Sequence, residues 1–180
     1  MEINKLIVLF ESYKEKDKII NSVILPYKYF FEGYYATEIR VKNKLEGYSV
    51  IFLNENDQRI LASTQIISKL SFNKYAVNEE TLKYISEKIK SYISLSNKII
   101  LIEFGSIYLL EPDVGSSLIN LFASDKKTIV FAKKSKEIES TMNKLYDAIV
   151  INLTKKESKS IKKVVDRFIG EAVLRMEING

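Results

Sequence analysis

The 180-residue chain contains no cysteine and no histidine. The absence of cysteine excludes disulfides and thiolate chemistry, and the absence of histidine removes the commonest metal ligand and the usual general base. Any catalysis must therefore use carboxylates, lysines, hydroxyls or a metal ion held by oxygen ligands.

The chain is also poor in arginine and has no long apolar run. Its arginines are Arg40, Arg59, Arg167 and Arg175, so the net charge of +5 comes mostly from lysines scattered among acids. Nucleic-acid sites usually cluster arginine with lysine, so a solvated lysine and glutamate surface is favoured and a nucleic-acid partner is not expected. The apolar stretch 6–10 is too short for a signal peptide, and no run approaches the roughly 20 residues of a membrane span. We expect a cytoplasmic protein that does not bind membranes.

Apolar residues are plentiful enough for one core. They make up 46% of the chain, and the length suits a single domain over residues 1–180. Segments typical of strands and of helices alternate, which favours a parallel sheet covered by helices on both faces. The sequence therefore predicts a three-layer α/β fold.

The spacing of apolar residues predicts the individual elements. Short apolar runs predict buried strands at 5–10, 98–104, 127–132 and 148–153. Apolar residues at helical spacing predict helices at 15–25, 79–93, 136–145 and 161–176.

Three residues predict helix boundaries. Pro26 should end the first helix, because proline cannot donate the backbone hydrogen bond that a helix interior needs. The side chain of Asn78 can cap the second helix. Pro112 stands where the first turn of a further helix would begin, and Val114 and Leu118 belong to its buried face.

Two extended segments after the first helix predict a β-hairpin. They cover 34–41 and 47–53, and the turn-prone Asn43 lies in the connection 42–46. A short strand at 59–62 continues them. We expect the hairpin at or beyond one edge of the parallel sheet.

Several segments, taken in order, resemble a known family. They are "EGYYATEIRVKNKLEGYSVIFLNENDQRILAS" at 32–63, "NKYAVNEETLKYI" at 73–85, and the end of the strand at 102–105. The order and spacing are similar to those of the THEP-type nucleoside-triphosphatases, P-loop proteins related to nucleotide kinases. The resemblance implies a P-loop NTPase-like fold, with a mainly parallel sheet flanked by helices and an added β-hairpin. It also implies hydrolysis of a nucleoside triphosphate (NTP) with Mg²⁺.

The resemblance places the family's phosphate-binding loop, G-x-x-x-x-G-K-[ST], on residues 10–17. The two glycines are replaced by Phe10 and Glu15, the lysine is retained as Lys16, and the Mg²⁺-binding hydroxyl is replaced by Asp17. A phosphate cradle needs glycine because its backbone N–H groups must close on the oxygens at unusual dihedral angles.

The charges and side chains of this segment also oppose phosphate binding. Its acids offset its lysines, where a cradle should attract a polyanion. We expect Phe10 and Tyr13 to occupy the space that nucleotide phosphates would otherwise take.

The resemblance shows a second altered motif, at the end of the strand 98–104. The family's Mg²⁺-binding aspartate is replaced by Ile102, whereas Glu103 survives and could orient a water. Glu103 is either catalytic or a structural carboxylate held by hydrogen bonds. Lys16 either contacts phosphate or is solvated. Glu38 and Arg40 match the family and are either a structural pair or groups that line the site.

These substitutions predict an NTPase homologue that has lost most hydrolysis, because they act on one metal–phosphate centre. It would serve as a scaffold for a protein partner or as a weak nucleotide binder. The alternative is an active Mg-dependent enzyme with an atypical site of Lys16, Asp17 and Glu103, whose carboxylates would bind Mg²⁺ directly. Magnesium and an NTP are implied only if this site works, and no other cofactor is expected.

Overall fold

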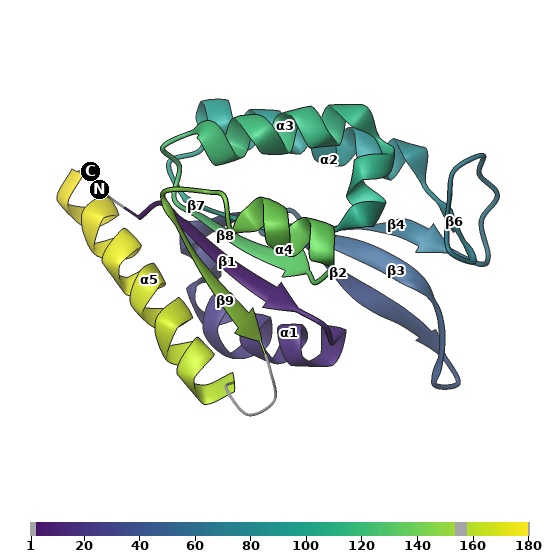
Figure 1. The fold of residues 1–180 in the computed structure, drawn as a ribbon, viewed down its shortest axis with the longest axis horizontal. Helices are drawn as coiled ribbons and strands as arrows, with labels where there is room; N and C mark the ends of the chain where they lie inside the picture. Colours follow the sequence, from purple (N-terminus) through teal and green to yellow (C-terminus); the bar gives the residue numbers. More distant parts are fainter. Residues whose placement is uncertain (1–2, 154–157, 180) are drawn as a thin grey trace.

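The computed structural model describes residues 3–153 and 158–179, which form one nine-stranded sheet with helices packed against it (Figure 1). The strands are β1 (Lys5–Phe10), β2 (Phe31–Val41), β3 (Lys44–Phe52), β4 (Asp57–Ser63), β5 (Ser71–Phe72), β6 (Tyr75–Val77), β7 (Ile99–Phe104), β8 (Thr128–Lys133) and β9 (Ala148–Leu153). Across the sheet their order is β5-β6-β4-β3-β2-β7-β8-β1-β9.

The sheet has a parallel half and an antiparallel half, and β2 belongs to both. The strands β7, β8, β1 and β9 continue from β2 with parallel pairings. On its other side, β3, β4, β6 and β5 follow with antiparallel pairings. The predicted α/β fold is confirmed, and the predicted hairpin of β2 and β3 belongs to a longer antiparallel extension. The short strands β5 and β6 were not predicted, because two or three residues are too few to show an alternating pattern.

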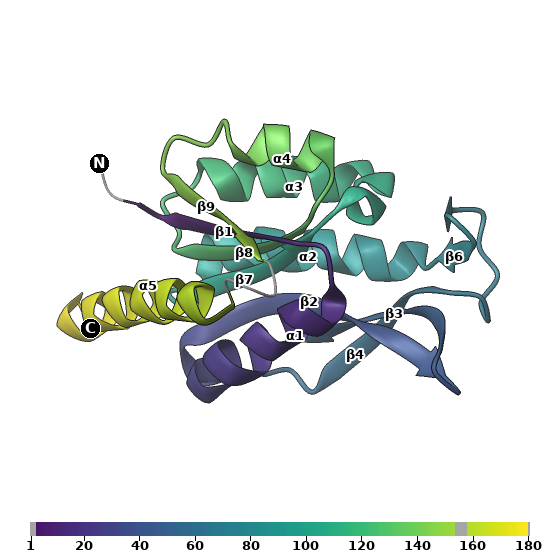
Figure 2. The ribbon, with the colours of Figure 1, turned by 60° about the horizontal axis from the view of Figure 1, so that its bottom comes forward.

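Helices cover both faces of the sheet and give three layers (Figures 1 and 2). One face is covered by α2 (Glu79–Leu95), α3 (Pro112–Ala123) and α4 (Lys136–Met142), and the other by α1 (Tyr13–Ile19) and α5 (Ser158–Asn179). Within β1, Ile7 and Leu9 face the first core, whereas Leu6, Val8 and Phe10 face the second. The strand is buried on both sides, which is why its sequence is a continuous apolar run. No helix of the described residues is long and apolar enough to cross a membrane.

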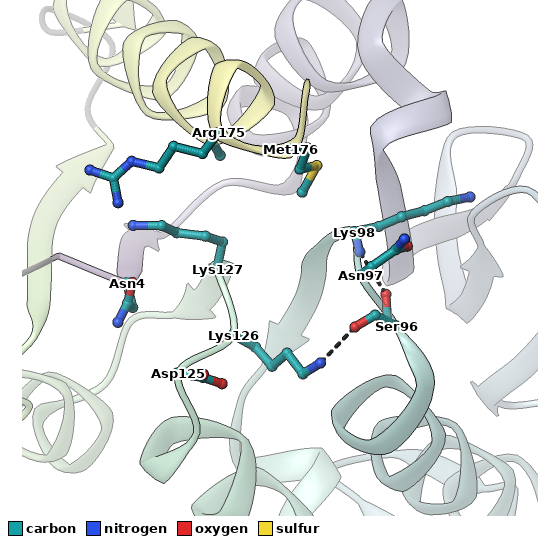
Figure 3. A pocket seen from close by; sticks show the side chains of 10 residues that line it. Asn4, Ser96, Asn97, Lys98, Asp125, Lys126, Lys127, Arg175 and Met176 are labelled. Carbon is teal, nitrogen blue, oxygen red and sulfur yellow. Dashed lines mark hydrogen bonds between the residues drawn. The ribbon is translucent and has the colours of Figure 1, made fainter. Parts of the chain in front are cut away.

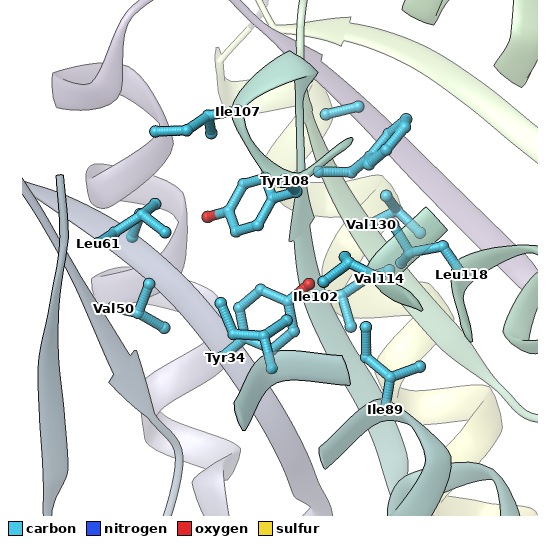
Figure 4. Close-up of a cluster of buried hydrophobic side chains, with 14 of the residues drawn as sticks. Tyr34, Val50, Leu61, Ile89, Ile102, Ile107, Tyr108, Val114, Leu118 and Val130 are labelled. Atoms are coloured by element: carbon cyan, nitrogen blue, oxygen red, sulfur yellow. The ribbon is translucent and has the colours of Figure 1, made fainter. Parts of the chain in front are cut away.

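The core beneath α2 and α3 combines aliphatic side chains with buried aromatic ones, among them Tyr34 and Tyr108 (Figure 4). Tyr34 of β2 and Tyr108 are almost completely buried, and their ring centroids lie 5.9 Å apart. Ile102 of β7 packs in the same cluster and is fully buried. The position at which the resemblance implies a metal-binding aspartate is therefore filled by a packing residue.

The first predicted helix differs from the structure in its helix type and length. Beyond α1 the chain continues as a π-helix (Ile20–Ile24) and then as a 3-10 helix (Leu25–Phe30). Pro26 was predicted to end the first helix, but the helical path continues through this residue. It lies in the first turn of the 3-10 helix, where its missing N–H removes no hydrogen bond.

Other predicted boundaries agree more closely with the structure. The Asn78 side chain accepts a hydrogen bond of 3.2 Å from the backbone N–H of Thr81, and Pro112 begins α3. The hairpin turn is shorter than predicted, because only Lys42 and Asn43 connect β2 to β3. Both have a positive φ, 49° and 64°, as a tight two-residue hairpin turn requires.

Gly33 is the point at which β2 changes partners. The ladder with β7 ends at the pair Gly33 and Leu101, and from Tyr34 onward β2 pairs with β3. Gly33 has a φ of 134°, and a Cβ atom there would lie 1.8 Å from the carbonyl oxygen of Leu101. Both the backbone conformation and the close approach therefore require glycine.

Substitution of Gly33 by alanine should destabilise the protein by about 2 kcal/mol or more, because the added methyl group collides with β7. The matched control is Gly170→Ala in α5, where a Cβ atom meets nothing within 4 Å. This control should stabilise the protein by up to about 1 kcal/mol through helix propensity. Urea unfolding of both variants measures the difference. Equal stabilities would contradict the close packing at Gly33.

Candidate functional site

The site residues expected from the sequence lie at the carboxyl ends of the parallel strands. Lys16 and Asp17 come from α1, which follows β1, and Glu103 is the penultimate residue of β7. Ligands of open α/β sheets usually bind at this edge. The structure brings Lys16, Asp17 and Glu103 together, whereas Glu38 and Arg40 lie further along β2.

The connection between β1 and α1 is too short for a phosphate loop. Only two residues separate Phe10 from Tyr13, the first residue of α1. Ser12 caps the helix: its hydroxyl accepts from the N–H of Glu15 at 3.4 Å, and its carbonyl accepts from the N–H of Lys16 at 3.1 Å. The rings of Phe10 and Tyr13 pack edge to face, 5.2 Å apart. The amides of Glu15 and Lys16 at this helix terminus are therefore already used within the chain.

Lys16 is completely buried. Its ammonium group donates to Glu103 Oε2 at 2.6 Å and to the carbonyl oxygen of Ala36. The ring centroids of Phe10 and Tyr13 lie 5.3 and 4.5 Å from its Nζ, at distances typical of cation–π contacts. The prediction of a solvated Lys16 is wrong, because the residue faces the sheet and not the solvent.

The carboxylate of Glu103 is also fully buried and receives four donors. Oε2 accepts from Lys16 and, at 2.9 Å, from the backbone N–H of Ala36. Oε1 accepts from the hydroxyl groups of Tyr13 at 3.1 Å and Tyr108 at 3.5 Å. A carboxylate offers about four lone-pair positions, so the protein itself occupies all of them. To orient a water or bind a metal ion, Glu103 would first have to lose one of these partners.

The buried carboxylate also affects the neighbouring tyrosines. Burial first, and then the charge of Glu103, raises the pKa of Tyr13, Tyr108 and Tyr34 above the usual range for tyrosine. These hydroxyl groups therefore stay protonated at neutral pH. Tyr13 and Tyr108 donate hydrogen bonds to Glu103, and none of the three tyrosines is available as a tyrosinate base.

The ion pair also completes the sheet where two strands part. The ladder between β2 and β7 ends at Gly33, three residues before Ala36. The N–H of Ala36 donates to Glu103, and its carbonyl accepts from Lys16. The two side chains thus satisfy buried backbone groups that would otherwise need a neighbouring strand.

Asp17 is the third charged residue of the site. Its Oδ1 atom lies 3.3 Å from Lys16 Nζ, so one ammonium group faces two carboxylates. Burial raises the pKa of Asp17, although the charge of Lys16 acts in the opposite direction. The described residues contain no group of three or more acidic, histidine or cysteine side chains that could hold a metal ion.

Glu38 and Arg40 pair with each other near the outer end of β2. Arg40 donates from Nε to Glu38 at 2.8 Å and from Nη1 to the carbonyl of Asn43 at 3.0 Å. Within the described part of the chain, neither side chain lines the cavity beside Glu103. The geometry agrees with a structural pair at the hairpin.

A cavity of about 280 Å³ opens beside Glu103. Its lining includes the aromatic side chains of Tyr48 and Phe72 and the cations of Lys133 and Lys134. Burial lowers the pKa of Lys133, against the opposing effect of nearby carboxylates. The sequence did not point to these lysines, because they lie at the end of β8, and the place of β8 between β7 and β1 depends on strand order.

Comparison with known proteins agrees with this architecture. A family profile described as NTPase matches residues 16–165. The chain belongs to this NTPase family. The match begins at Lys16, so most of the segment 10–17 lies outside it. Among curated proteins, no sequence matches this family member significantly.

Two solved structures share the fold of this NTPase-family chain. One is the crystal structure of THEP1 from the hyperthermophile Aquifex aeolicus, with a TM-score of 0.74 and 18% identity over 89% of this chain and 96% of that one. The other is the solution structure of a human cancer-related nucleoside triphosphatase, with a TM-score of 0.62 and 13% identity over 89% and 95% of the two chains. At these identities the likeness shows the fold alone.

Substitution of Lys16 by methionine should destabilise the protein, because it leaves the buried Glu103 carboxylate without its cation. Breaking a buried ion pair in this way costs about 3–5 kcal/mol. The double variant Lys16→Met/Glu103→Gln should lose less free energy of unfolding than the two single variants lose together. Urea unfolding of the four proteins measures this coupling.

Lys18→Met is the matched control for Lys16→Met. Lys18 lies on the same helix, its side chain is 56% exposed, and it pairs with Glu15 at 3.0 Å. Its removal should change the stability by no more than about 0.5 kcal/mol. The ion pair between Lys16 and Glu103 would be refuted if the double variant lost as much free energy of unfolding as the two single variants together. It would also be refuted if Lys16→Met and Lys18→Met lost the same amount.

Substitution of Asp17 by asparagine should raise the melting temperature at neutral pH. The pKa of Asp17 is higher in the folded protein than in the unfolded chain, so its ionised form destabilises the fold. This destabilisation disappears as the pH falls below the ordinary pKa of aspartate, near roughly 3.9. The rise in melting temperature should therefore be present at neutral pH and absent at pH values below the ordinary pKa of aspartate. Thermal melts followed by circular dichroism test this, and a loss of stability at neutral pH would show that Lys16 needs both carboxylates.

Proposed function

We propose that this chain is an NTPase-family protein that hydrolyses NTPs poorly or not at all. The observation that carries the proposal is the buried ion pair between Lys16 and Glu103, in which each residue occupies the charged group of the other. The lysine that would contact phosphate is buried on the carboxylate, and the carboxylate that would orient water is filled by protein donors.

The surroundings of the pair support the same conclusion. Phosphoryl transfer depends on a backbone cradle and on Mg²⁺ held beside the phosphates. The two-residue connection before α1 provides no cradle, and Ile102 provides no ligand for the metal. The segment 10–17 is instead occupied by the end of β1, the cap of α1 and its first turn.

Opening the pair would be costly. A nucleotide that reached Lys16 would have to displace Glu103 and also break the hydrogen bonds to Ala36. A cost of about 3–5 kcal/mol for separating a buried pair would weaken binding by a factor of roughly 10² to 4 × 10³. This cost would arise before any chemistry began.

The alternative is an active enzyme in which Asp17 and Glu103 bind Mg²⁺ directly and Lys16 contacts phosphate. Both carboxylates are oriented toward Lys16, at 3.3 and 2.6 Å. The metal ion would have to enter the space that the ammonium group occupies, and Lys16 would have to move out. This arrangement requires a different position of the Lys16 side chain.

Weak nucleotide binding without hydrolysis is a second candidate function. The cavity beside Glu103 offers aromatic side chains, Tyr48 and Phe72, on which a base could stack, and two lysines for an anion. Lys133 and Lys134 would then replace Lys16 as the phosphate contacts.

We also propose that the chain is a single domain, that it works in the cytoplasm and that it has a protein partner. The fully exposed Ile67, between β4 and β5, is a candidate contact for that partner.

Phosphate release from ATP, GTP and CTP with Mg²⁺ tests the loss of hydrolysis. We expect turnover no higher than the background, with no further drop in Lys16→Met or Glu103→Gln, each checked to be folded at the assay temperature. Turnover that both substitutions abolish would instead establish the active alternative.

Thermal shift with Mg-ATP, in the same preparations, separates weak binding from none. A saturable shift lost in Lys133→Ala and kept in Lys136→Ala would support binding in the cavity, because Lys136 is exposed and lies outside its lining. A ligand at 100 times its dissociation constant stabilises a fold by about 2.7 kcal/mol. If Mg-ATP does not change the melting temperature, the proposal that remains is a scaffold for a protein partner.

A further inference from the structure

The strand β9 forms one edge of the sheet, beside β1 (Figures 1 and 2). Among the described residues it pairs with β1 alone, so the backbone groups on its outer side are free to pair with another strand. Five of its six residues are at least partly exposed, whereas every residue of β1 is buried. The opposite edge of the sheet belongs to β5, which has only two residues. Of the two edges, β9 therefore offers the longer template for another strand.

The usual protections of an edge strand are missing from β9. Its sequence, AIVINL, contains no charged residue, no proline and no glycine. Its register with β1 runs from Ala148 to Leu153 without a shift, so no bulge turns it away from a neighbour. Sheets commonly use charges, prolines or bulges at their edges to prevent pairing with other chains. This edge is therefore suited to a partner strand.

An apolar groove of about 440 Å³ lies between β9 and α5, next to this edge. Its apolar lining includes Ile149 and Ile151 of β9, and Val164 and Phe168 of α5. Ile149 keeps 37% of its surface exposed there. A strand placed beside β9 would cover this side chain as well as the free backbone groups, and apolar contact together with hydrogen bonds is what a specific interface needs.

We propose that a second copy of this chain covers the edge, with its β9 antiparallel to the first. Two-fold symmetry is the commonest arrangement of identical chains, and it brings the same surface of both copies together. An antiparallel pair of identical strands satisfies this symmetry, and its main-chain hydrogen bonds would join the two sheets into one. The pairing does not depend on the function proposed for the site of Lys16 and Glu103.

The side chains of β9 determine where the two-fold axis can lie. Directly opposed residues of an antiparallel pair lie on the same face of the sheet. Ala148 and Val150 pack on the face covered by α2, α3 and α4. Ile151 and Leu153 pack on the face covered by α1 and α5. The axis must therefore pass beside one residue, and the middle of the strand is Val150 or Ile151. Ile149 would then lie opposite Ile151 or Leu153 of the second copy, so apolar side chains meet in either register.

The charges beside the groove favour a second copy. Arg167 and Glu171 both line it, one turn apart on α5, and pair with each other at 3.0 Å. A two-fold axis perpendicular to the sheet would make the two copies of α5 run in opposite directions. Two opposite charges one turn apart are self-complementary in that arrangement, because each can face its opposite in the second copy. The remaining charge of the described lining, Lys127, donates from Nζ to the carbonyl oxygen of Ile3 at 2.7 Å.

Sedimentation velocity of the full chain over a range of concentrations tests the dimer. We expect a reversible dimer whose dissociation constant rises about tenfold or more in Ile149→Lys, because this change places an ammonium group in the apolar contact between the copies. The matched control is Ile119→Lys. Ile119 is 69% exposed on α3 and lies outside the groove, so its substitution should change the dissociation constant less than about twofold.

Asn152→Lys is a second variant at the same edge, for the case that Ile149→Lys lowers the stability of the monomer. Asn152 is exposed, so the added charge leaves the packing of the single chain unchanged, whereas a lysine on an edge strand opposes pairing. Thermal melts check that each variant is folded. Amide hydrogen exchange gives a readout specific to this edge, because the outer N–H groups of β9 should exchange more slowly as the protein concentration rises.

Three results would overturn the proposal. The first is a chain that stays monomeric at hundreds of micromolar. The second is a dimer that Ile119→Lys weakens as much as Ile149→Lys and Asn152→Lys do, or that none of them weakens, because its contact would lie elsewhere. The third is slow exchange in β9 that appears only when a different protein is added to a monomeric chain, which would assign the edge to a foreign strand.

Discussion

The buried ion pair between Lys16 and Glu103 joins the parts of the fold that meet at the carboxyl edge. It connects α1 to β7 and, through the backbone of Ala36, to β2. This contact lies just beyond Gly33, where β2 leaves β7 and begins to pair with β3. The antiparallel extension therefore depends on two charged side chains at the point where it departs from the parallel sheet.

The surroundings of the pair explain why it is both strong and difficult to open. Phe10 and Tyr13 exclude water from the ammonium group, and Tyr13 and Tyr108 donate to the carboxylate. In such a dry environment a satisfied ion pair is held firmly, and an unpaired charge is costly. Lys16 and Glu103, which would be needed for phosphoryl transfer in an open site, are therefore paired with each other inside the fold. Loss of either charge affects the sheet as well as the site.

The two ends of the parallel strands differ in the charged residues that they bring together. At the carboxyl edge, the ammonium group of Lys16 faces the carboxylates of Asp17 and Glu103. At the amino ends of the strands, Lys98, Lys126, Lys127, Arg175 and Asp125 are among the described residues that line a cavity (Figure 3). Charge that is already paired gives a ligand little to gain, so the buried pair offers little to an anion.

The sequence by itself determined the local elements of this protein and the chemistry that it lacks. Apolar runs and helical spacing predicted the strands of the parallel half and most helices, and Asn78 and Pro112 predicted helix starts, because these signals depend on neighbouring residues. Only the tertiary structure decided that Lys16 is buried on Glu103 and that Lys133 stands beside them. Strand order brings these residues together from distant parts of the chain, and burial then decides whether a lysine meets water, phosphate or a carboxylate. No local pattern carries that information.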